Sequence, residues 1–231
     1  MESYMNRISN TGIVPVVKIL EKEDAYPLAK ALLNGGIDVI EVTYRSEHAT
    51  SAIQTISKEL PDMLVGAGTV LSVDQAKEAV EAGAKFIITP GFNTKVVQWC
   101  LDHDIEVYPG VSTASEIEMA LSMGLTQLKF FPAESSGGAK KLKDLSAPYA
   151  NVHFMPTGGI NTKNMHDYLA LPNVEAIGGS FMLPNDLVVA KDWDGIEALS
   201  RATIKSLLDF QLIHVGINTN SPEESKQVTD T

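Results

Sequence analysis

The stretch Ile13-Val-Pro-Val-Val-Lys-Ile19, followed by Asp24-Ala-Tyr-Pro-Leu-Ala-Lys-Ala-Leu-Leu33, sets the pattern from which the fold is predicted. The first run has the β-branched content of a short buried strand, and the second has the apolar spacing of a helix that ends at Gly35-Gly36. The same order of a short apolar run and a helical run repeats up to about Phe210. Such alternation is typical of parallel strands joined by covering helices.

This repeat predicts an α/β protein built as a single (β/α)8 TIM barrel over residues 1–210. An open doubly wound sheet can also be built from alternating units. We favour the barrel because polar residues and glycines recur at the C-terminal ends of many strands, not at one switch point.

The expected elements follow directly from this pattern. Strands are expected at residues 13–19, 38–44, 63–68, 86–90, 106–110, 127–131, 152–155 and 175–178. Helices are expected at residues 24–33, 49–60, 94–101, 114–123, 139–145, 163–171 and 194–210, and another opens at Ser72 or Asp74 and ends at Gly83.

The pattern changes at residues 211–231. Leu212-Ile-His-Val-Gly-Ile217 reads as an added strand, and the residues after it are polar and acidic. We interpret this segment as a C-terminal extension or as the start of a truncated second domain. His214 has no partner histidine or carboxylate cluster nearby in sequence, so it is expected to be an ordinary strand residue.

Composition limits the classes of partner. The chain has 231 residues, of which 44% are hydrophobic and 20% are charged, as in an ordinary globular protein. Its 18 Lys and Arg against 29 Asp and Glu give a formal charge of -11, so a broad surface for nucleic acid is not expected. A local anion site remains compatible with this charge.

Cys100 is the only cysteine, which excludes an intramolecular disulfide and a cysteine-cluster metal site and fits a reducing compartment. We expect its side chain to pack as a small apolar group. We find no signal-peptide pattern near Met1 and no apolar run long enough to span a membrane. A cytoplasmic protein without a membrane segment is therefore expected.

A single lysine lies between apolar residues in Gln127-Leu-Lys-Phe-Phe131, a short buried strand that Pro132 ends. Burial disfavours the charged form of an amine, and the neutral amine is the form that attacks a carbonyl. Lys129 is therefore a candidate nucleophile. Taken alone, the same pattern also fits a lysine at a strand end that extends to water or pairs with a carboxylate.

Glu41, Thr43 and Arg45 occupy alternate positions of the second expected strand, so their side chains are expected to point to one face, the barrel interior. One interpretation is a buried ion pair between Glu41 and Arg45 that only sets strand register. The functional interpretation places Glu41 deep as a proton carrier and Arg45 near the strand end, where it can bind a substrate carboxylate.

Glycine-rich segments follow the third, seventh and eighth expected strands. These are Gly66-Ala-Gly68-Thr69, Thr157-Gly158-Gly159-Ile160-Asn161 and Gly178-Gly179-Ser180. Loops after strands seven and eight commonly hold phosphate in barrels, through backbone N–H groups and a helix N-terminus. The alternative is ordinary turn chemistry.

The segments around Glu41 and Lys129 closely resemble the two signature segments of the 2-keto-3-deoxy-6-phosphogluconate (KDPG) and 2-keto-4-hydroxyglutarate (KHG) aldolases. Gly66-Ala-Gly-Thr-Val70 and Thr157-Gly-Gly-Ile-Asn161 lie in the expected order, and the resemblance covers residues 6–210. Tyr44 departs from the leucine or phenylalanine usual at its position. On an alternating strand it should point toward the helices.

This resemblance implies a class I aldolase without a metal or other cofactor, which forms a Schiff base between Lys129 and pyruvate and uses Glu41 as general acid and base. It also implies a small keto-acid substrate, KDPG or KHG, and a homotrimer. The residues that it implies at the substrate are Arg45 and Thr69 at the carboxylate, Thr157 near the reacting end, Gly158, Gly159, Gly179 and Ser180 at the phosphate, and Pro90 and Phe131 as pocket walls.

Two other classes of protein remain open. An isomerase or epimerase on a phosphate-binding barrel would use carboxylates for proton transfer and would form no Schiff base. A sugar-phosphate sensor would keep the phosphate loops without turnover, but it would not need Glu41, Arg45 and Lys129 on inward faces.

Overall fold

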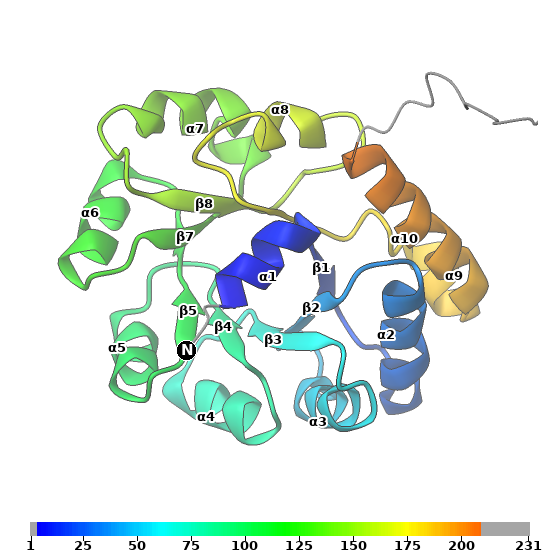
Figure 1. Ribbon diagram of the computed structural model, residues 1–231. Coiled ribbons are helices and arrows are strands. Elements are labelled where there is room, and N and C mark those ends of the chain that lie inside the picture. Colours follow the sequence, from blue (N-terminus) through cyan, green and yellow to red (C-terminus); the bar gives the residue numbers. More distant parts are fainter. Residues whose placement is uncertain (1–3, 209–231) are drawn as a thin grey trace, which may run out of the picture.

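The computed structural model describes residues 4–208 and consists of short strands surrounded by helices (Figure 1). Within that range the strands are β1 (Ile13–Val17), β2 (Val39–Thr43), β3 (Leu64–Gly68), β4 (Phe86–Ile88), β5 (Glu106–Tyr108), β6 (Gly110–Val111), β7 (Gln127–Phe130), β8 (His153–Pro156) and β9 (Ile177–Gly179).

Helices occupy most of the intervals between these strands. They are α1 (Tyr4–Thr11), α2 (Ala25–Asn34), α3 (Ala49–Glu59), α4 (Val73–Glu81), α5 (Thr94–Asp102), α6 (Ala114–Ser122), α7 (Gly138–Ser146), α8 (Met165–Leu169), α9 (Asn185–Ala190) and α10 (Trp193–Leu207), with 3-10 turns η1 (Lys22–Asp24) and η2 (Glu134–Ser136).

Local sequence explains where several helices begin and end. Ser72, rather than Asp74, caps α4, because its side chain accepts a hydrogen bond from the backbone N–H of Gln75. Thr113 and Glu116 form a capping box at the start of α6. Gly83, just after α4, has φ +111°, a conformation that glycine adopts without a Cβ clash.

All strand pairs are parallel, and the protein has an α/β fold with a curled sheet. Six strands pair in the order β5-β4-β3-β2-β1-β9, and three pair in the order β6-β7-β8. The expected fifth strand is divided between these groups at Pro109. Proline has no N–H to continue the ladder with β4, and its carbonyl instead accepts from Lys129 N at 3.0 Å.

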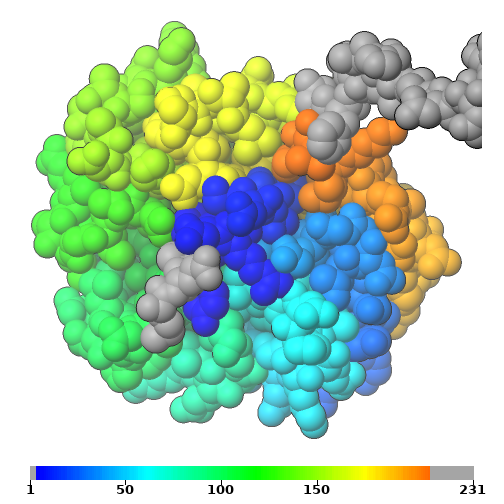
Figure 2. Space-filling model, in the orientation of Figure 1, coloured from blue at the N-terminus to red at the C-terminus, as the bar shows by residue number. Residues whose placement is uncertain are grey.

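Two apolar cores lie on the two faces of the curled sheet. The inner core contains Val14, Val39, Phe86 and Met155, and the outer core fills the space between strands and helices. The helix α1 lies across the middle of the strands (Figure 1), and its side chains fill the centre of this face (Figure 2). Met5 and Ile8 of α1 belong to the inner core, so α1 closes the N-terminal side of the sheet.

The prediction missed α1 and α9, and it set several strand ends too far. Only Met5 and Ile8 of α1 are buried, which leaves too little apolar periodicity to indicate a helix. Ile19, Tyr44 and Pro90 were expected in strands that end earlier, at Val17, Thr43 and Ile88. The extension at residues 211–231, with His214, lies outside the described residues, as do the last two residues of the expected domain.

Over residues 4–208, each helix is either too short or too polar to cross a lipid bilayer.

Candidate active site

Lys129 and Glu41 form a buried ion pair on the inner face of the sheet. Lys129 lies in β7, where it pairs with Gly110 of β6 and Met155 of β8, and its side chain is 5% exposed. Its Nζ lies 3.3 Å from Oε1 of Glu41, whose side chain is fully buried in β2. The other carboxylate oxygen, Oε2, has no hydrogen-bond partner among residues 4–208. A buried oxygen with free lone pairs is suited to receive a proton.

Gly68 makes room for this carboxylate. In the parallel register of β2 and β3 Gly68 lies opposite Thr43, and a Cβ at Gly68 would stand 1.9 Å from Oε1 and 2.4 Å from Cγ of Glu41. Gly68, which ends the third strand, therefore leaves the space that the Glu41 carboxylate occupies. The sequence pattern alone did not indicate this role.

Gly68→Ala is expected to displace the Glu41 carboxylate from Lys129, because two atoms cannot approach to that distance. We expect kcat/KM to fall by roughly 100-fold, and the free energy of unfolding to fall by about 1–3 kcal/mol. Steady-state kinetics and urea unfolding measure the two effects. Gly91→Ala is the matched control, because a Cβ at Gly91 would have no heavy atom of residues 4–208 within 4 Å apart from its own chain neighbours. Equal activity of both variants would contradict the assigned packing.

Arg45 and Thr43 lie at the C-terminal end of β2. Thr43 is fully buried, and its hydroxyl donates to the carbonyl of Val17 at 2.8 Å and accepts from Nε of Arg45 at 3.2 Å. Arg45 was expected inside the second strand, but β2 ends at Thr43, and Arg45 is an exposed residue beyond it. The alternative of a buried pair between Glu41 and Arg45 is wrong, since Glu41 pairs with Lys129.

Tyr44 points toward the helices, as expected from alternation. Its hydroxyl lies 3.0 Å from Oγ1 of Thr50 in α3, and its ring packs on the outer core. Burial raises the pKa of Tyr44. The unusual residue at this position therefore faces away from the pair of Lys129 and Glu41.

Thr69, Pro90 and Phe131 each follow the end of a strand and are half-buried. Thr69 has φ +55°, a left-handed conformation that is rare for a threonine. Nζ of Lys129 lies 5.2 Å from the ring centroid of Phe131. These positions place Phe131 directly at the lysine and put Thr69 and Pro90 on the same rim of the sheet.

Two of the glycine-rich segments, residues 157–161 after β8 and residues 178–180 at the end of β9, also lie at this rim. Thr157 is buried and bridges to Gly178, and Gly158 and Gly159 have φ +99° and +84°. The loop after β7 contacts the loop after β8. Ala133 N donates a hydrogen bond of 2.8 Å to the carbonyl of Thr157 there. Gly179 is buried at the end of β9, and Ser180 after it is exposed.

A cavity of about 390 Å³ opens at the ends of β1, β2 and β9, and neither Lys129 nor Glu41 lines it. Arg45 and Ser180 line it, together with Lys18 and Asn185, which were not singled out in the sequence. Alternation could have found Lys18, since it lies four residues after Val14, a residue of the inner core.

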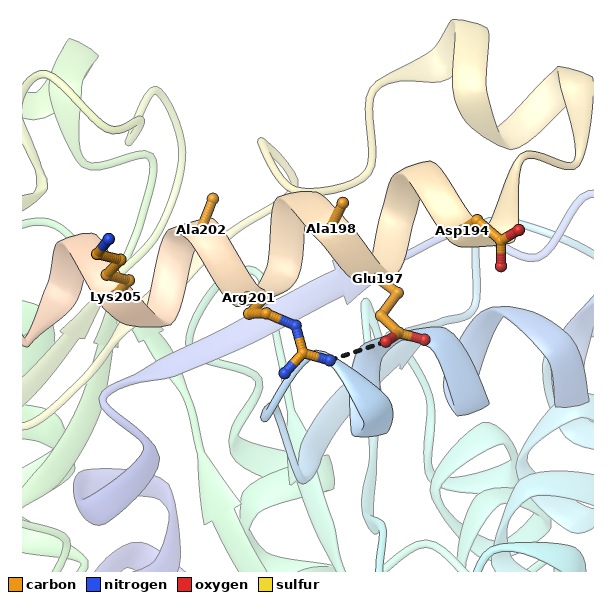
Figure 3. Close-up of a pocket in the computed structure, with 6 residues that line it drawn as sticks. All are labelled: Asp194, Glu197, Ala198, Arg201, Ala202 and Lys205. Carbon is orange, nitrogen blue, oxygen red and sulfur yellow. Dashed lines mark hydrogen bonds and ion pairs between the residues drawn. The ribbon is translucent and has the colours of Figure 1, made fainter. Parts of the chain in front are cut away.

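A second hollow lies on the outer surface of α10 (Figure 3). Arg201 and Glu197 form an ion pair of 2.8 Å there, one helical turn apart. Such exposed pairs contribute little to stability. This hollow is lined by one helix alone, so it does not bring residues of different strands together.

Within residues 4–208 no group of three or more His, Cys, Asp or Glu side chains could hold a metal ion.

Cys100 is fully buried in α5, and burial raises the pKa of its thiol to about 12. Because the thiolate is the reactive form, alkylation of the folded protein at pH 8 is expected to be roughly 100-fold slower, or more, than alkylation in denaturant. Mass spectrometry after timed quenching measures both rates. Fast labelling of the folded, active protein would contradict the packing of this side chain.

A buried amine beside a carboxylate, at the C-terminal side of parallel strands, is the arrangement of an enzyme that can bond covalently to a carbonyl substrate. The family model "KDPG and KHG aldolase" matches residues 4–199. The chain therefore belongs to the KDPG and KHG aldolase family, whose members are carbon–carbon lyases.

Individual relatives agree with this assignment. The chain is 45% identical to the 2-dehydro-3-deoxy-phosphogluconate aldolase of Treponema pallidum, over 89% of this chain and 98% of that protein. It is 46% identical to the KHG/KDPG aldolase of Escherichia coli K12, over 86% of this chain and 93% of that protein. The KDPG aldolase of Legionella pneumophila, solved with pyruvate captured as a covalent carbinolamine, has a TM-score of 0.84 and 40% identity, covering 87% and 98% of the two chains.

Proposed function

We propose that this protein is a class I aldolase that cleaves KDPG to pyruvate and glyceraldehyde 3-phosphate and also accepts KHG, which gives pyruvate and glyoxylate. The observation that carries this proposal is the buried contact of 3.3 Å between Nζ of Lys129 and Oε1 of Glu41. The covalent pyruvate intermediate in the Legionella enzyme supports the same chemistry.

Lys129 is the proposed nucleophile. Its ammonium first passes a proton to the Glu41 carboxylate, and the amine then attacks C2 of the keto acid. Glu41 returns that proton to the C2 hydroxyl, which leaves the carbinolamine as water and gives an iminium ion. The iminium accepts the electron pair of the C3–C4 bond as that bond breaks, which leaves an enamine on the lysine. Protonation of the enamine at C3 and hydrolysis release pyruvate and restore the amine.

Glu41 is the proposed proton carrier. Its carboxylate takes the proton of the C4 hydroxyl while the C3–C4 bond breaks, and it returns a proton toward C3 of the enamine. The position of its carboxylate beside Nζ lets one group serve both steps. Its Oε2, which accepts no hydrogen bond from the described part of the chain, is free to hold that proton between them.

The remaining residues are proposed to bind substrate. Arg45 and Thr69 would hold the carboxylate and so orient the iminium for bond cleavage. Thr157 would lie near the reacting end of the substrate, and Pro90 and Phe131 would form the walls of the pocket. The phosphate would bind to the backbone N–H groups of the two glycine loops, at Gly158, Gly159, Gly179 and Ser180.

Reduction with borohydride in the presence of pyruvate tests the proposal. We expect a permanent mass increase on Lys129, located by peptide mapping. An isomerase, an epimerase or a sugar-phosphate sensor would give no adduct, and an adduct on another lysine would contradict the assignment. Turnover of KDPG and KHG by the same preparation then separates an aldolase from a sensor that merely binds.

We also propose that the two strand groups complete one (β/α)8 barrel domain. Consecutive strands β5 and β6 connect the groups on one side. On the other, β8 bridges to the segment of β9 through Phe154–Val174 and Thr157–Gly178. Slow hydrogen exchange at the amides of Phe154 and Glu175, which donate across this junction, is the result expected for a closed sheet.

We also propose that the protein forms a homotrimer and is located in the cytoplasm. Large exposed apolar side chains such as Leu71 and Met119 support an interface between copies. A chain with a single cysteine suits a reducing compartment. Sedimentation equilibrium should give a mass near three times 24.9 kDa, and a monomer would contradict the trimer.

A further inference from the structure

Thr43 is a buried polar residue of the sheet that has no role in the steps proposed for Lys129 and Glu41. It lies two residues after Glu41 on β2, so the two side chains point to the same face of the sheet. Thr43 is fully buried, and across the ladder with β3 it lies opposite Gly68, which has no side chain to meet it. A buried hydroxyl at this position needs hydrogen-bond partners from elsewhere.

The Thr43 hydroxyl acts both as a donor and as an acceptor. It donates its hydrogen to the carbonyl of Val17 in β1 at 2.8 Å, and its oxygen accepts from Nε of Arg45 at 3.2 Å. Because a hydroxyl has only one hydrogen, and the backbone of the neighbouring strand already takes it, the oxygen can present only lone pairs to Arg45. The direction of the hydrogen bond between Arg45 and Thr43 is therefore fixed.

The backbone at Thr43 is held from both sides. The strand β2 pairs with β1 and with β3, and the N–H of Tyr44 still donates to the carbonyl of Gly68 at 2.8 Å. Arg45 follows directly and is exposed. A long exposed side chain loses rotamer freedom when it binds a ligand, and that loss is smaller when part of the side chain is already held. Thr43 holds Nε of Arg45 in this way.

This contact leaves the outer end of the guanidinium free. A guanidinium has one N–H on Nε and two on each terminal nitrogen. Thr43 accepts from Nε, and none of the ion pairs within residues 4–208 involves Arg45. The two terminal nitrogens can therefore donate side by side to one carboxylate, which is the geometry of a bidentate pair.

We propose that Thr43 is a positioning residue for substrate binding, which holds Nε of Arg45 so that the two terminal nitrogens face the carboxylate of the keto acid. This inference rests on the proposed aldolase function and deepens it. Thr43 acts through Arg45, because its own hydroxyl is occupied by Val17 and by the guanidinium. Since KDPG, KHG and pyruvate share the 2-keto carboxylate, Thr43 serves all three alike.

Thr43→Val keeps the branched shape of the side chain and removes the hydroxyl. We expect KM for KDPG and KM for KHG to rise by the same factor, about 10-fold, while kcat changes by less than about twofold. The pyruvate concentration that half-saturates borohydride trapping should rise with them. Thr43→Ser keeps the hydroxyl and should return all three constants close to the wild-type values. Circular dichroism checks folding, and Thr43→Ala removes the same hydroxyl if the added methyl group of valine prevents folding.

A double-mutant cycle with Arg45 separates positioning from a general structural role. In an Arg45→Met background, Thr43→Val should leave the half-saturating pyruvate concentration nearly unchanged, because no guanidinium is left to position. Thr203→Val is the matched control, since Thr203 is a buried threonine of α10, a helix outside the sheet. Its removal of a hydroxyl should leave both KM values unchanged.

Equal effects of Thr43→Val with and without the Arg45 guanidinium would overturn the proposal. Unchanged KM values in Thr43→Val, or a rise that Thr43→Ser does not reverse, would overturn it as well. A rise in KM for KDPG alone would also contradict it, because KHG carries the same keto-acid carboxylate. If the wild-type protein gave no borohydride adduct with pyruvate, the proposed function itself would fail, which is a different result from an adduct that forms equally well in Thr43→Val.

Discussion

Lys129→Met is expected to abolish both the pyruvate adduct and aldol cleavage, with a loss in kcat/KM of roughly four orders of magnitude or more. The thioether has a similar volume but no amine, so no iminium can form to accept the electrons of the C3–C4 bond. Borohydride trapping and steady-state cleavage of KDPG measure the two losses. Retention of either a trapped adduct or substantial cleavage would reject Lys129 as the nucleophile.

The same substitution is expected to destabilise the fold. Glu41 is fully buried, and Lys129 is the cation beside its carboxylate. Removing one partner of a buried pair typically lowers the free energy of unfolding by about 3–5 kcal/mol. The double variant Lys129→Met, Glu41→Gln removes both charges and should recover most of that loss while remaining inactive. Recovery of stability without activity separates the chemical role of Lys129 from its structural one.

Glu41→Gln is expected to lower kcat for cleavage by roughly 100- to 10,000-fold while the pyruvate adduct still forms. Glutamine keeps the shape of the side chain and an oxygen for Nζ of Lys129, but it cannot take the proton from the C4 hydroxyl. Cleavage should therefore be lost while trapping of the pyruvate adduct persists.

Exchange of the methyl protons of pyruvate with deuterium isolates this step. Exchange needs formation and protonation of the enamine at C3 but no aldehyde, so Glu41→Gln should lose it along with cleavage. Proton NMR in deuterium oxide follows the rate. If the variant kept rapid exchange, or lost the adduct while retaining cleavage, Glu41 could not be the proton carrier.

Prediction of the elements succeeded where a segment carries its own periodicity. The runs around Val39 and Leu128 are dense in apolar residues, and each forms a strand within a residue or two of the expected limits. The helix α1 was missed because its burial depends on the inner core beneath it. Arg45 was predicted to lie in a strand because the alternation of side chains continues past Thr43 in the sequence. The register of β2 with β3, however, ends at Thr43.

The sequence by itself determined the repeat of strand and helix, the apolar surroundings of Lys129 and the glycine loops after the later strands. Each of these is a local pattern, governed by residues near one another in the chain. Only the tertiary structure decided that Lys129 pairs with Glu41, 88 positions away, and that Gly68 leaves space for that carboxylate. Lys18, Arg45 and Ser180 likewise line one cavity only because β1 pairs with both β2 and β9. Alternation indicates which face a side chain takes, but its partners across the sheet depend on strand order and register, which are set by the packing of the whole chain.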